Sequence, residues 1–400
     1  MNNDAPGGPL AGITVIDLTR ALAGPYASQM MADGGADVIK IERPGKGDDS
    51  RSWGPPFVGE ANSQESAYFL SLNRSKRSVT LDLKDPQARE RLKELIRDAD
   101  VLVENFRPGV MERLGLGETQ LEALNPRLVA LSITGFGEGG PHGHRPGFDQ
   151  IVQGESGLMS FTGPVGGPPT KVGVPIGDIL AGMFGAYGVV SALVERNRSG
   201  RGQRVTTSLL GGMIAIHTFQ GTRWLLAGDL PQPEGNRHPL IAPYGTFECK
   251  DGNINIAVGS EGLWRRFAPL VDLDPEESRF AGNRDRVARI EELEASMAPA
   301  LMSATIDEWM ERLDAAGIPA GRILSVEEVY RSPQVEHLGL VDEVEHPTLG
   351  TLRLPGSPLR YSRSHRGAAS PPPALGQHND EVLGGEADEA GKPASGQTEA

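Results

Sequence analysis

Apolar residues in the first half of the chain fall into short blocks separated by charged and glycine-rich stretches. Residues 12–18 and 37–43 have the near-continuous apolar character of buried parallel strands. Between them, a loop at 19–24 leads into a helix through 29–33, which Gly34 and Gly35 end. The alternation continues with strands at 78–83, 101–106 and 128–136 and a helix at 85–98. This pattern predicts a large doubly wound, Rossmann-like α/β domain.

The pattern changes after Leu226, where proline-rich and polar residues replace the strand and helix alternation. Residues 244–258 read as a hairpin turning at Asp251 and Gly252, and Thr305 with Glu308 forms a capping box before a helix. We therefore expect a first part of the large domain at 1–226 and a smaller α+β domain at 227–353. We further expect a return to the large domain at 354–383 and a disordered tail at 384–400.

Charge and composition narrow the classes of ligand. The chain has 39 basic and 53 acidic residues and a net charge of -14, which disfavours a general nucleic-acid-binding surface. An anionic ligand would need local basic residues or helix N-termini. With one cysteine, Cys249, the chain has no intrachain disulfide or cysteine metal cluster, and no zinc or P-loop pattern occurs.

The first residues lack a basic segment followed by an apolar one, so they do not resemble a secretory signal. The longest apolar run, 179–194, falls short of the roughly 20 residues that span a bilayer. The expectation is a cytoplasmic protein without a membrane partner.

One carboxylate, Asp178, has a distinctive position. It follows a proline- and glycine-rich loop and directly precedes the apolar run, at the predicted N-terminus of a buried helix. Free backbone N–H groups stabilise negative charge there, and Gly177 beside it would let a ligand approach the backbone. A catalytic carboxylate and a simple helix cap both fit this position.

Basic residues follow the predicted strands. Arg43 closes one strand, Lys84 follows another and Arg107 follows a third, where open α/β sheets bind ligands. A polyphosphate would suit this rim, although solvated surface arginines would look the same. A dinucleotide site is disfavoured because the turn at 19–24 lacks the three-glycine fingerprint.

Several motifs together resemble the family III CoA-transferases, or CaiB/BaiF family, which includes formyl-CoA transferase, carnitine CoA-transferase and α-methylacyl-CoA racemase. The resemblance covers about residues 9–383. The motifs are PLAGITVIDL at 9–18, GP at 24–25, GADVIKIERP at 35–44, NRSKRS at 73–78, DVLVENF at 100–106, IGD at 176–178, GRGQ at 200–203 and GQHNDEVL at 376–383.

This resemblance implies roles for particular residues. The nucleophilic aspartate of the family falls on Asp178, and coenzyme A is the implied cofactor, bound as an acyl-CoA substrate. The implied CoA-contacting positions are Arg20, Leu22, Ala23, Arg43, Leu81 to Lys84, Asn105, Phe106, Arg107, Arg113, Gly147, Phe148 and Asp149. It also implies an interlocked homodimer whose active site lies between the large domain of one chain and the small domain of the other.

Two departures refine the prediction. Racemases carry a histidine at the position of Phe148, which cannot exchange a proton, so a transferase is preferred over a racemase. Residues 235–244 lack the glycine run of formyl-CoA transferase, which argues against formyl or oxalate specificity and resembles members acting on dicarboxylic or longer acyl groups.

The predicted function is transfer of CoA from an acyl-CoA donor to a carboxylic acid acceptor. The route runs through an aspartyl mixed anhydride and an enzyme–CoA thioester. Asn236, Arg237 and His238 are candidates for binding the acid, and a polar interdomain loop explains them equally well. An α-methylacyl-CoA racemase and a non-catalytic acyl-CoA-binding protein stay open as alternatives, and a nicotinamide enzyme is disfavoured.

Overall fold

In the computed structural model, residues 7–60, 64–364 and 369–384 are described, and the chain forms two compact units. The smaller unit consists of Gly157–Lys171 and Arg223–His337. The larger unit contains the other described residues, and each unit is described by itself below. Residues 385–400, where we expect a disordered tail, lie outside the described residues.

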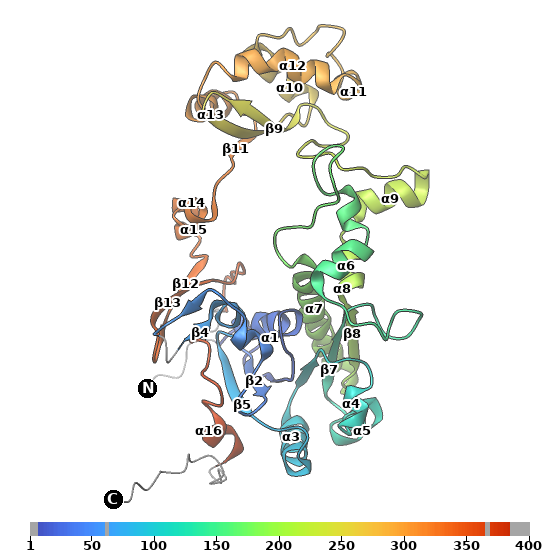
Figure 1. The fold of residues 1–400 in the computed structure, drawn as a ribbon, viewed down its shortest axis with the longest axis vertical. Coiled ribbons are helices and arrows are strands. Elements are labelled where there is room, and N and C mark those ends of the chain that lie inside the picture. The colour runs from blue at the N-terminus through green and yellow to red at the C-terminus, as the bar shows by residue number, and fades with distance from the viewer. Residues whose placement is uncertain (1–6, 61–63, 365–368, 385–400) are drawn as a thin grey trace, which may run out of the picture. The chain divides into compact units, whose positions relative to one another are not determined.

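The larger unit is built on a six-stranded sheet in the order β5-β2-β1-β6-β7-β8 (Figure 1). Every neighbouring pair in it is parallel. The strands are β1 (Thr14–Asp17), β2 (Asp37–Glu42), β5 (Lys76–Thr80), β6 (Val101–Glu104), β7 (Val129–Thr134) and β8 (Arg204–Ser208). The chain builds outward from β1 in one direction and then from β6 in the other, so the strand order reverses between these two strands. Ligands of doubly wound sheets bind beside such a reversal.

Helices cover both faces of this sheet. Ile16 of β1 packs with Leu92 and Ile96 of α3 (Pro86–Asp98), and α5 (Glu118–Leu124) joins the same core. The next residue, Asp17, points to the opposite face and accepts a hydrogen bond from Ser28 of α1 (Ala23–Asp33). The long helix α7 (Ile176–Ser199) packs beside α1 and over β7 and β8. The predicted α/β class with a parallel sheet is confirmed.

Local sequence signals explain where the helices start. Asp85 caps α3 by accepting a hydrogen bond from the Gln87 N–H, and Pro86 takes the first helical position as expected.

Helix α7 packs closely because its buried face is made of small residues. A Cβ at Gly182 would lie 2.7 Å from the Ala23 carbonyl oxygen, and one at Gly185 would lie 2.9 Å from Leu131.

Among the described residues, α7 is long and apolar enough to cross a membrane by length and composition. Its 24 residues exceed the apolar run that the sequence suggested. Half of its most apolar window is buried inside the protein, against α1 and the sheet, which is the environment of a core helix.

Shorter elements complete the larger unit. They are β3 (Phe57–Val58), β4 (Glu65–Ser66), α2 (Ala67–Leu70), α4 (Val110–Arg113), α6 (Asp149–Glu155), α8 (Leu209–Ala215), β12 (Val341–His346), β13 (Gly350–Pro355), α16 (Asn379–Leu383) and the 3₁₀ turn Asp49–Ser52. Helix α9 (Thr218–Ala227) crosses the boundary between the units.

The hairpin of β12 and β13 differs from the expected domain boundary, which assigned residues up to 353 to the smaller domain. Val344, Leu352 and Leu354 of the hairpin pack with Leu70 of α2. Arg74 donates a hydrogen bond to the Pro355 carbonyl. The chain therefore returns to the larger unit at Leu338 rather than near 354.

The smaller unit has its own sheet and core. Strands β9 (Tyr244–Cys249) and β10 (Gly252–Ala257) form the expected hairpin, and β11 (Ala320–Arg322) pairs with β10. The core includes Trp264, Phe267 and Trp309. The capping box of Thr305 and Glu308 is present. The helices are α10 (Glu261–Phe267), α11 (Asn283–Ala288), α12 (Ile290–Leu301), α13 (Ile306–Ala315), α14 (Val326–Tyr330) and α15 (Pro333–His337), with 3₁₀ turns at Leu158–Phe161 and Ala268–Val271.

Candidate active site

Asp178 lies in the first turn of α7, as the sequence predicts. The residue at the N-cap position is Pro175, and no side chain of the N-cap accepts a hydrogen bond from the helix. Asp178 is thus not the cap of its own helix. Burial, and secondarily the charge of Asp149, raise the pKa of Asp178 to about 7. A partly buried carboxylate that shares its site with a second acid is typical of a chemically active group.

Asp178 lines a cavity of about 880 Å³, which we call the Asp178 cavity. The segments that follow β1, β6 and β7 form it, together with the starts of α1, α6 and α7. This is the position beside the strand-order reversal. Ten of the predicted site residues line it, namely Arg20, Leu22, Ala23, Asn105, Phe106, Arg107, Gly147, Phe148, Asp149 and Asp178.

A second cavity of about 350 Å³ adjoins the first, because Arg20, Phe106 and Arg107 line both. The predicted residues Arg43, Leu81 and Lys84 line this second cavity. Arg113 lines neither of them and ends the short helix α4. The other predicted contacts therefore form one elongated lining with basic side chains spread along it.

The arginines of this lining have different partners. Arg20 and Arg43 both pair with Asp49, at 3.0 and 2.7 Å, and all three side chains are substantially exposed. Arg107 forms no ion pair with any residue that the structure describes, so its charge is available to an anion. Charge-assisted hydrogen bonds from arginine are strong and suit phosphate or carboxylate groups.

The loop that follows β1 has a strained backbone and lines the Asp178 cavity. Ala21 has a left-handed backbone conformation with φ of 68°, which residues other than glycine rarely adopt. Its N–H donates to Asp48 Oδ1 at 3.1 Å, and the amide of Asn105 bonds both the N–H and the carbonyl of Arg20, at 3.0 and 2.7 Å. These hydrogen bonds hold the loop in its strained conformation. The predicted contact Asn105 thus also shapes the site.

Buried charged residues also hold this loop in place. Lys40 Nζ contacts Asp48 Oδ2 and the Thr19 carbonyl, both at 2.9 Å. Lys76 donates to Asp17 Oδ2 at 3.2 Å. Burial opposes the charge of Asp17, but the two lysines and its hydrogen bonds lower its pKa overall. Burial lowers the pKa of Lys76 to about 8. This ion cluster fixes the strand ends that carry the site.

The sequence reasoning missed two aromatic residues in the Asp178 cavity, Trp53 and Tyr68. Their rings meet edge to face at 4.9 Å. Burial, followed by the charges of Asp178, Asp149 and Asp48, raises the pKa of Tyr68 to about 12, so its hydroxyl stays a hydrogen-bond donor at neutral pH. The available signal was their position around the long polar connection after β2, the kind of loop that carries function.

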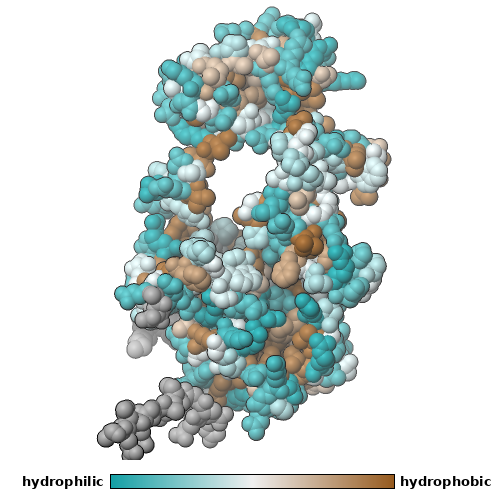
Figure 2. Space-filling model, viewed as in Figure 1, coloured by the Kyte–Doolittle hydropathy of each residue, from teal (hydrophilic) through white to brown (hydrophobic). Residues whose placement is uncertain are grey.

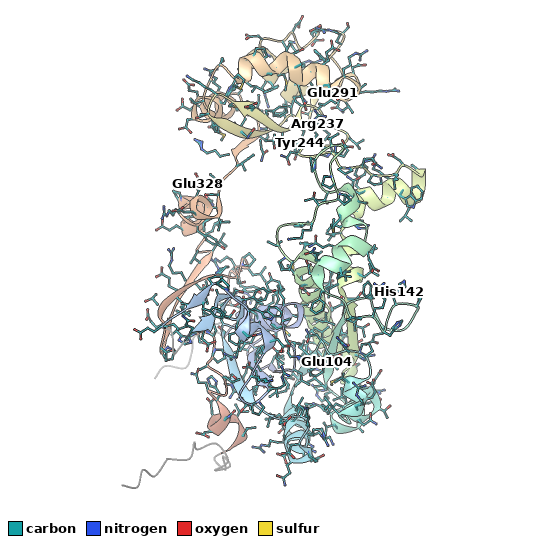
Figure 3. All side chains as sticks on the ribbon, in the orientation of Figure 1. Glu104, His142, Arg237, Tyr244, Glu291 and Glu328 are labelled. Carbon is teal, nitrogen blue, oxygen red and sulfur yellow. The ribbon has the colours of Figure 1, made fainter. Side chains whose placement is uncertain are left out.

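The candidates for binding the acid lie in the smaller unit, where local partners hold them. Arg237 pairs with Glu294 at 2.5 Å, and Figure 3 labels Arg237 beside Tyr244. The His238 N–H donates to the Tyr244 carbonyl, and the two rings lie 5.1 Å apart. The backbone carbonyl of Asn236 lies against Gly245. Their role toward a substrate stays a prediction.

Gly177 packs closely against a neighbouring side chain, and its predicted role toward a ligand stays a prediction. It is buried, and a Cβ there would lie 1.9 Å from the Cε atom of Met213. A side chain at this position would have to displace the Met213 methyl group, and Gly177 does not line the Asp178 cavity.

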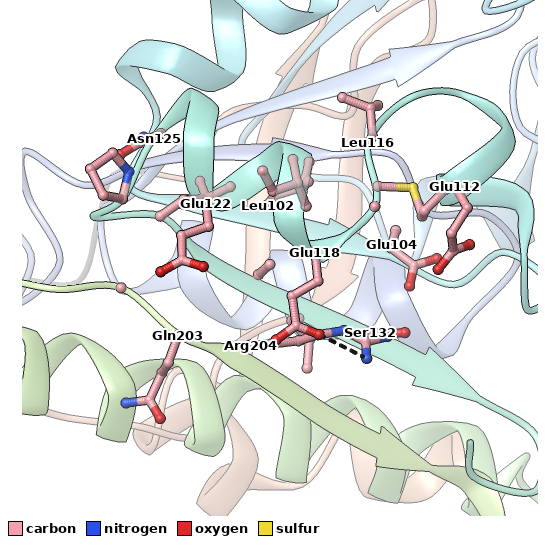
Figure 4. Close-up of a pocket in the computed structure, with 18 residues that line it drawn as sticks. Leu102, Glu104, Glu112, Leu116, Glu118, Glu122, Asn125, Ser132, Gln203 and Arg204 are labelled. Carbon is pink, nitrogen blue, oxygen red and sulfur yellow. Dashed lines mark ion pairs between the residues drawn. The ribbon is translucent and has the colours of Figure 1, made fainter. Parts of the chain in front are cut away.

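A further cavity of about 390 Å³ lies against β6, β7 and β8 and is closed by α4 and α5 (Figure 4). We call it the acid-rimmed cavity because Glu104, Glu112, Glu118 and Glu122 line it. Its single arginine, Arg204, is bonded to Glu138 and lies 3.9 Å from Glu118. Burial raises the pKa of Glu104. These charges disfavour a polyphosphate ligand.

Comparison with known protein families covers most of the chain. Residues 10–379 match CoA-transferase family III. The chain belongs to CoA-transferase family III. The predicted family and enzyme class are confirmed by this match.

Relatives and solved structures agree with the family. Succinyl-CoA:glutarate CoA-transferase of Mus musculus is 40% identical over 94% of this chain and 86% of its own length. Succinate–glutarate CoA-transferase of Agrobacterium fabrum is 40% identical over 94% and 95%, and acetyl-CoA:oxalate CoA-transferase of Acetobacter aceti is 40% identical over 89% and 90%. A CAIB/BAIF family protein from Brucella suis has a TM-score of 0.84 at 37% identity, covering 94% of this chain and 98% of that one.

Proposed function

We propose that this enzyme moves CoA from succinyl-CoA to a second dicarboxylic acid, with Asp178 as the covalent nucleophile. The observation that carries the proposal is the place of Asp178 in a cavity beside the strand-order reversal, at the start of a helix and among arginines. A carboxylate suits this reaction because its anhydride keeps the acyl group activated without ATP.

The first half of the reaction loads CoA onto the enzyme. A carboxylate oxygen of Asp178 attacks the thioester carbonyl carbon, the C–S bond breaks and CoA leaves as a thiolate, giving a mixed anhydride. The thiolate then attacks the side-chain carbonyl carbon of Asp178. The donor acid leaves as its carboxylate, and Asp178 is left as a thioester of CoA.

The second half runs these steps toward the acceptor. The acceptor carboxylate attacks the Asp178 thioester, releases CoA thiolate and forms a second mixed anhydride. The thiolate attacks the acceptor's acyl carbon, the bond to the Asp178 oxygen breaks, and the new acyl-CoA leaves behind a free Asp178 carboxylate. No net proton or electron is exchanged. The hydroxyl of Tyr68, which lines the same cavity, is suited to stabilise the oxyanions formed on the way.

Dicarboxylate substrates fit the charge of the lining. The predicted CoA-contacting residues Arg20, Arg43 and Arg107 would hold the phosphates. Arg145, which also lines the Asp178 cavity, is paired with Glu155 and would have to exchange that partner to meet the distal carboxylate of a substrate. The names of the mouse and Agrobacterium relatives support succinate and glutarate as the acid pair.

A homodimer belongs to the same proposal. On α7, Phe184, Tyr187 and Val194 are exposed although they are large and apolar, and on α9 so are Trp224, Leu225 and Leu226. Figure 2 shows hydrophobic side chains at the surface around α9. A second copy of the chain would bury such faces, which single soluble chains seldom expose together. The interlocked arrangement and the pairing of large and small domains rest on the family resemblance.

A matrix of donors and acceptors tests the function. Purified enzyme is mixed with succinyl-, acetyl-, oxalyl- or a longer acyl-CoA and one acid at a time, and the CoA thioesters are separated by chromatography. We expect fastest exchange between succinyl-CoA and C4–C6 dicarboxylates. Deuterium uptake at the α-carbon without an acceptor would instead support a racemase. Saturable CoA binding without any exchange would support a non-catalytic binder.

A further inference from the structure

A chain of hydrogen bonds links α6 to the start of α7. The Gly177 N–H donates to Asp149 Oδ1 at 2.8 Å, and the Gln153 side-chain amide donates to Asp149 Oδ2 at 2.7 Å. The carbonyl oxygen of Gln153 accepts from the Val172 N–H at 2.9 Å. Since the N-cap residue Pro175 offers no side-chain acceptor, Asp149 supplies the missing cap of α7 from another helix.

Packing leaves this turn little freedom. Met213 is fully buried, its sulfur lies 3.2 Å from Ser156 Oγ, and its methyl group fills the space beside Gly177. The Asp149 Oδ1 atom would lie 3.2 Å from a Cβ at Gly177. The position of Asp178, one residue further along, is therefore set by contacts made by its neighbour.

The charge of Asp149 matters because the charge of Asp178 changes during the reaction. A free Asp178 carboxylate is negative, whereas its anhydride and its thioester are neutral. Repulsion from a nearby fixed anion therefore raises the free energy of the resting carboxylate relative to both covalent states. The effect of Asp149 on the pKa of Asp178, second to burial, has the direction that this requires.

Other charged or titratable groups also line the Asp178 cavity. They are Tyr68 on α2, Asp49 and Arg20 near the ends of β1 and β2, Arg107 after β6 and Arg145 before α6. Tyr68 stays neutral near pH 7 because its pKa is raised to about 12. Of the carboxylates that line the cavity with Asp178, Asp149 is the one whose charge raises the pKa of Asp178.

We propose that Asp149 is a positioning residue that holds the first turn of α7 from α6 and whose negative charge favours acylation of Asp178. This inference rests on the proposed function, in which Asp178 is the nucleophile. It assigns Asp149 a role at the nucleophile in addition to the CoA contact that the family resemblance implies.

The test replaces the charge while keeping an acceptor. In Asp149→Asn, the amide oxygen can still accept from the Gly177 N–H. We expect the acid limb of the kcat/KM profile, near pH 7 in the wild type, to move down by roughly 0.5–1 pH unit. We also expect kcat at pH 8 to fall about three- to tenfold, because a less basic carboxylate is a weaker nucleophile. Asp149→Ser serves as a second neutral variant in case one of the two misfolds.

Asp85→Asn is the matched control. Asp85 also accepts a backbone N–H bond at a helix start, from Gln87 at 2.9 Å, but on α3. We expect its pH profile to match that of the wild type. Carboxyl ¹³C NMR of Asp178 measures the same midpoint without relying on turnover.

The results separate this inference from the function on which it rests. A folded Asp149→Asn or Asp149→Ser enzyme whose Asp178 midpoint and acid limb stay at the wild-type pH would overturn the role of Asp149. An equal shift in Asp85→Asn would overturn it as well. Near-normal exchange by Asp178→Asn would instead remove the nucleophile and with it the proposed mechanism.

Discussion

Two cavities on the same sheet differ in almost every property that decides what they can bind. The Asp178 cavity lies at the carboxyl ends of the strands, beside the reversal of strand order, and three arginines line it, Arg20, Arg107 and Arg145. The acid-rimmed cavity lies against β6, β7 and β8, with four glutamates and one arginine that is already paired (Figure 4). The sheet borders both cavities, and the arginines that line the first suit an anionic ligand such as the proposed acyl-CoA better than the glutamates that line the second.

This comparison teaches that enclosure alone does not identify a site. The acid-rimmed cavity has a well-formed apolar floor, including Leu102, Leu121 and Leu131. A ligand with several phosphates would meet repulsion there at short range. In the Asp178 cavity the same ligand would lie beside Arg107, which forms no ion pair with any described residue, and beside a carboxylate whose pKa is near neutrality.

The largest effect is expected from replacing Asp178, the proposed nucleophile of the Asp178 cavity. Asp178→Asn should reduce CoA exchange by at least about 10³-fold while CoA binding persists, because the amide cannot form the anhydride. Exchange rates with succinyl-CoA and a dicarboxylic acid, together with calorimetric titration of CoA, measure both parts. Near-normal turnover would break the assignment of chemistry to this cavity.

The same variant should also change stability in a pH-dependent way. The folded-state pKa of Asp178 is raised from its ordinary 3.8 to about 7, so its neutral form stabilises the fold at low pH and that stabilisation is lost as pH rises through 7. Asp178→Asn should therefore be more stable than the wild type above pH 7, by on the order of 1–3 kcal/mol. The difference should vanish below about pH 4. Thermal melts across this range measure it.

A pair of variants, one in each cavity, sharpens the comparison through charge. Arg107→Ala should raise KM for the acyl-CoA about tenfold, more at low salt, because it removes an unpaired cation from the Asp178 cavity. Arg204→Ala removes the paired arginine of the acid-rimmed cavity and should leave KM within about twofold. Equal effects from the two substitutions would contradict the assignment of acyl-CoA to the Asp178 cavity.

Another pair of variants tests how tightly the start of α7 is packed. Gly177→Ala places a Cβ 1.9 Å from Met213 and should cost about 1–3 kcal/mol of stability and lower kcat about tenfold. Gly173→Ala, on the loop before it, meets no atom within 4 Å and should change stability by less than about 0.5 kcal/mol. Urea unfolding and steady-state kinetics give both values, and a silent Gly177→Ala would show that the turn is not constrained.

The smallest effect is expected in the acid-rimmed cavity. Burial raises the pKa of Glu104, so the neutral form of this side chain stabilises the fold and the stabilisation is lost as pH rises through the folded pKa. Glu104→Gln should therefore melt slightly higher than the wild type at pH 8, with exchange unchanged within about twofold. A large loss of exchange with normal folding would mean that this cavity takes part in the reaction.

Much of the fold and of the Asp178 cavity could be predicted from the sequence, because the relevant signals are local. Strand periodicity, the cap at Asp85 and the capping box at Thr305 all depend on nearby residues, and the structure has them. Asp178 in the first turn of a buried helix follows from one apolar run after one loop. The basic residues after β2, β5 and β6 follow from strand ends.

Contacts between distant segments could not be read in this way. The bond from Gly177 to Asp149 spans 28 residues. The close fit of Met213 against Gly177 depends on how α7 and α8 pack. The β12–β13 hairpin joins the larger unit through Leu70, far earlier in the chain. The edge-to-face pair of Trp53 and Tyr68 likewise depends on how the loop after β2 folds back.

The central claim is that Asp178 itself becomes acylated. Enzyme mixed with succinyl-CoA and no acceptor is quenched with hydroxylamine, digested and examined by mass spectrometry. The account predicts a hydroxamate on the side chain of Asp178 that is absent without acyl-CoA and absent from Asp178→Asn. A hydroxamate on another residue, or full turnover with no adduct on Asp178, would contradict it.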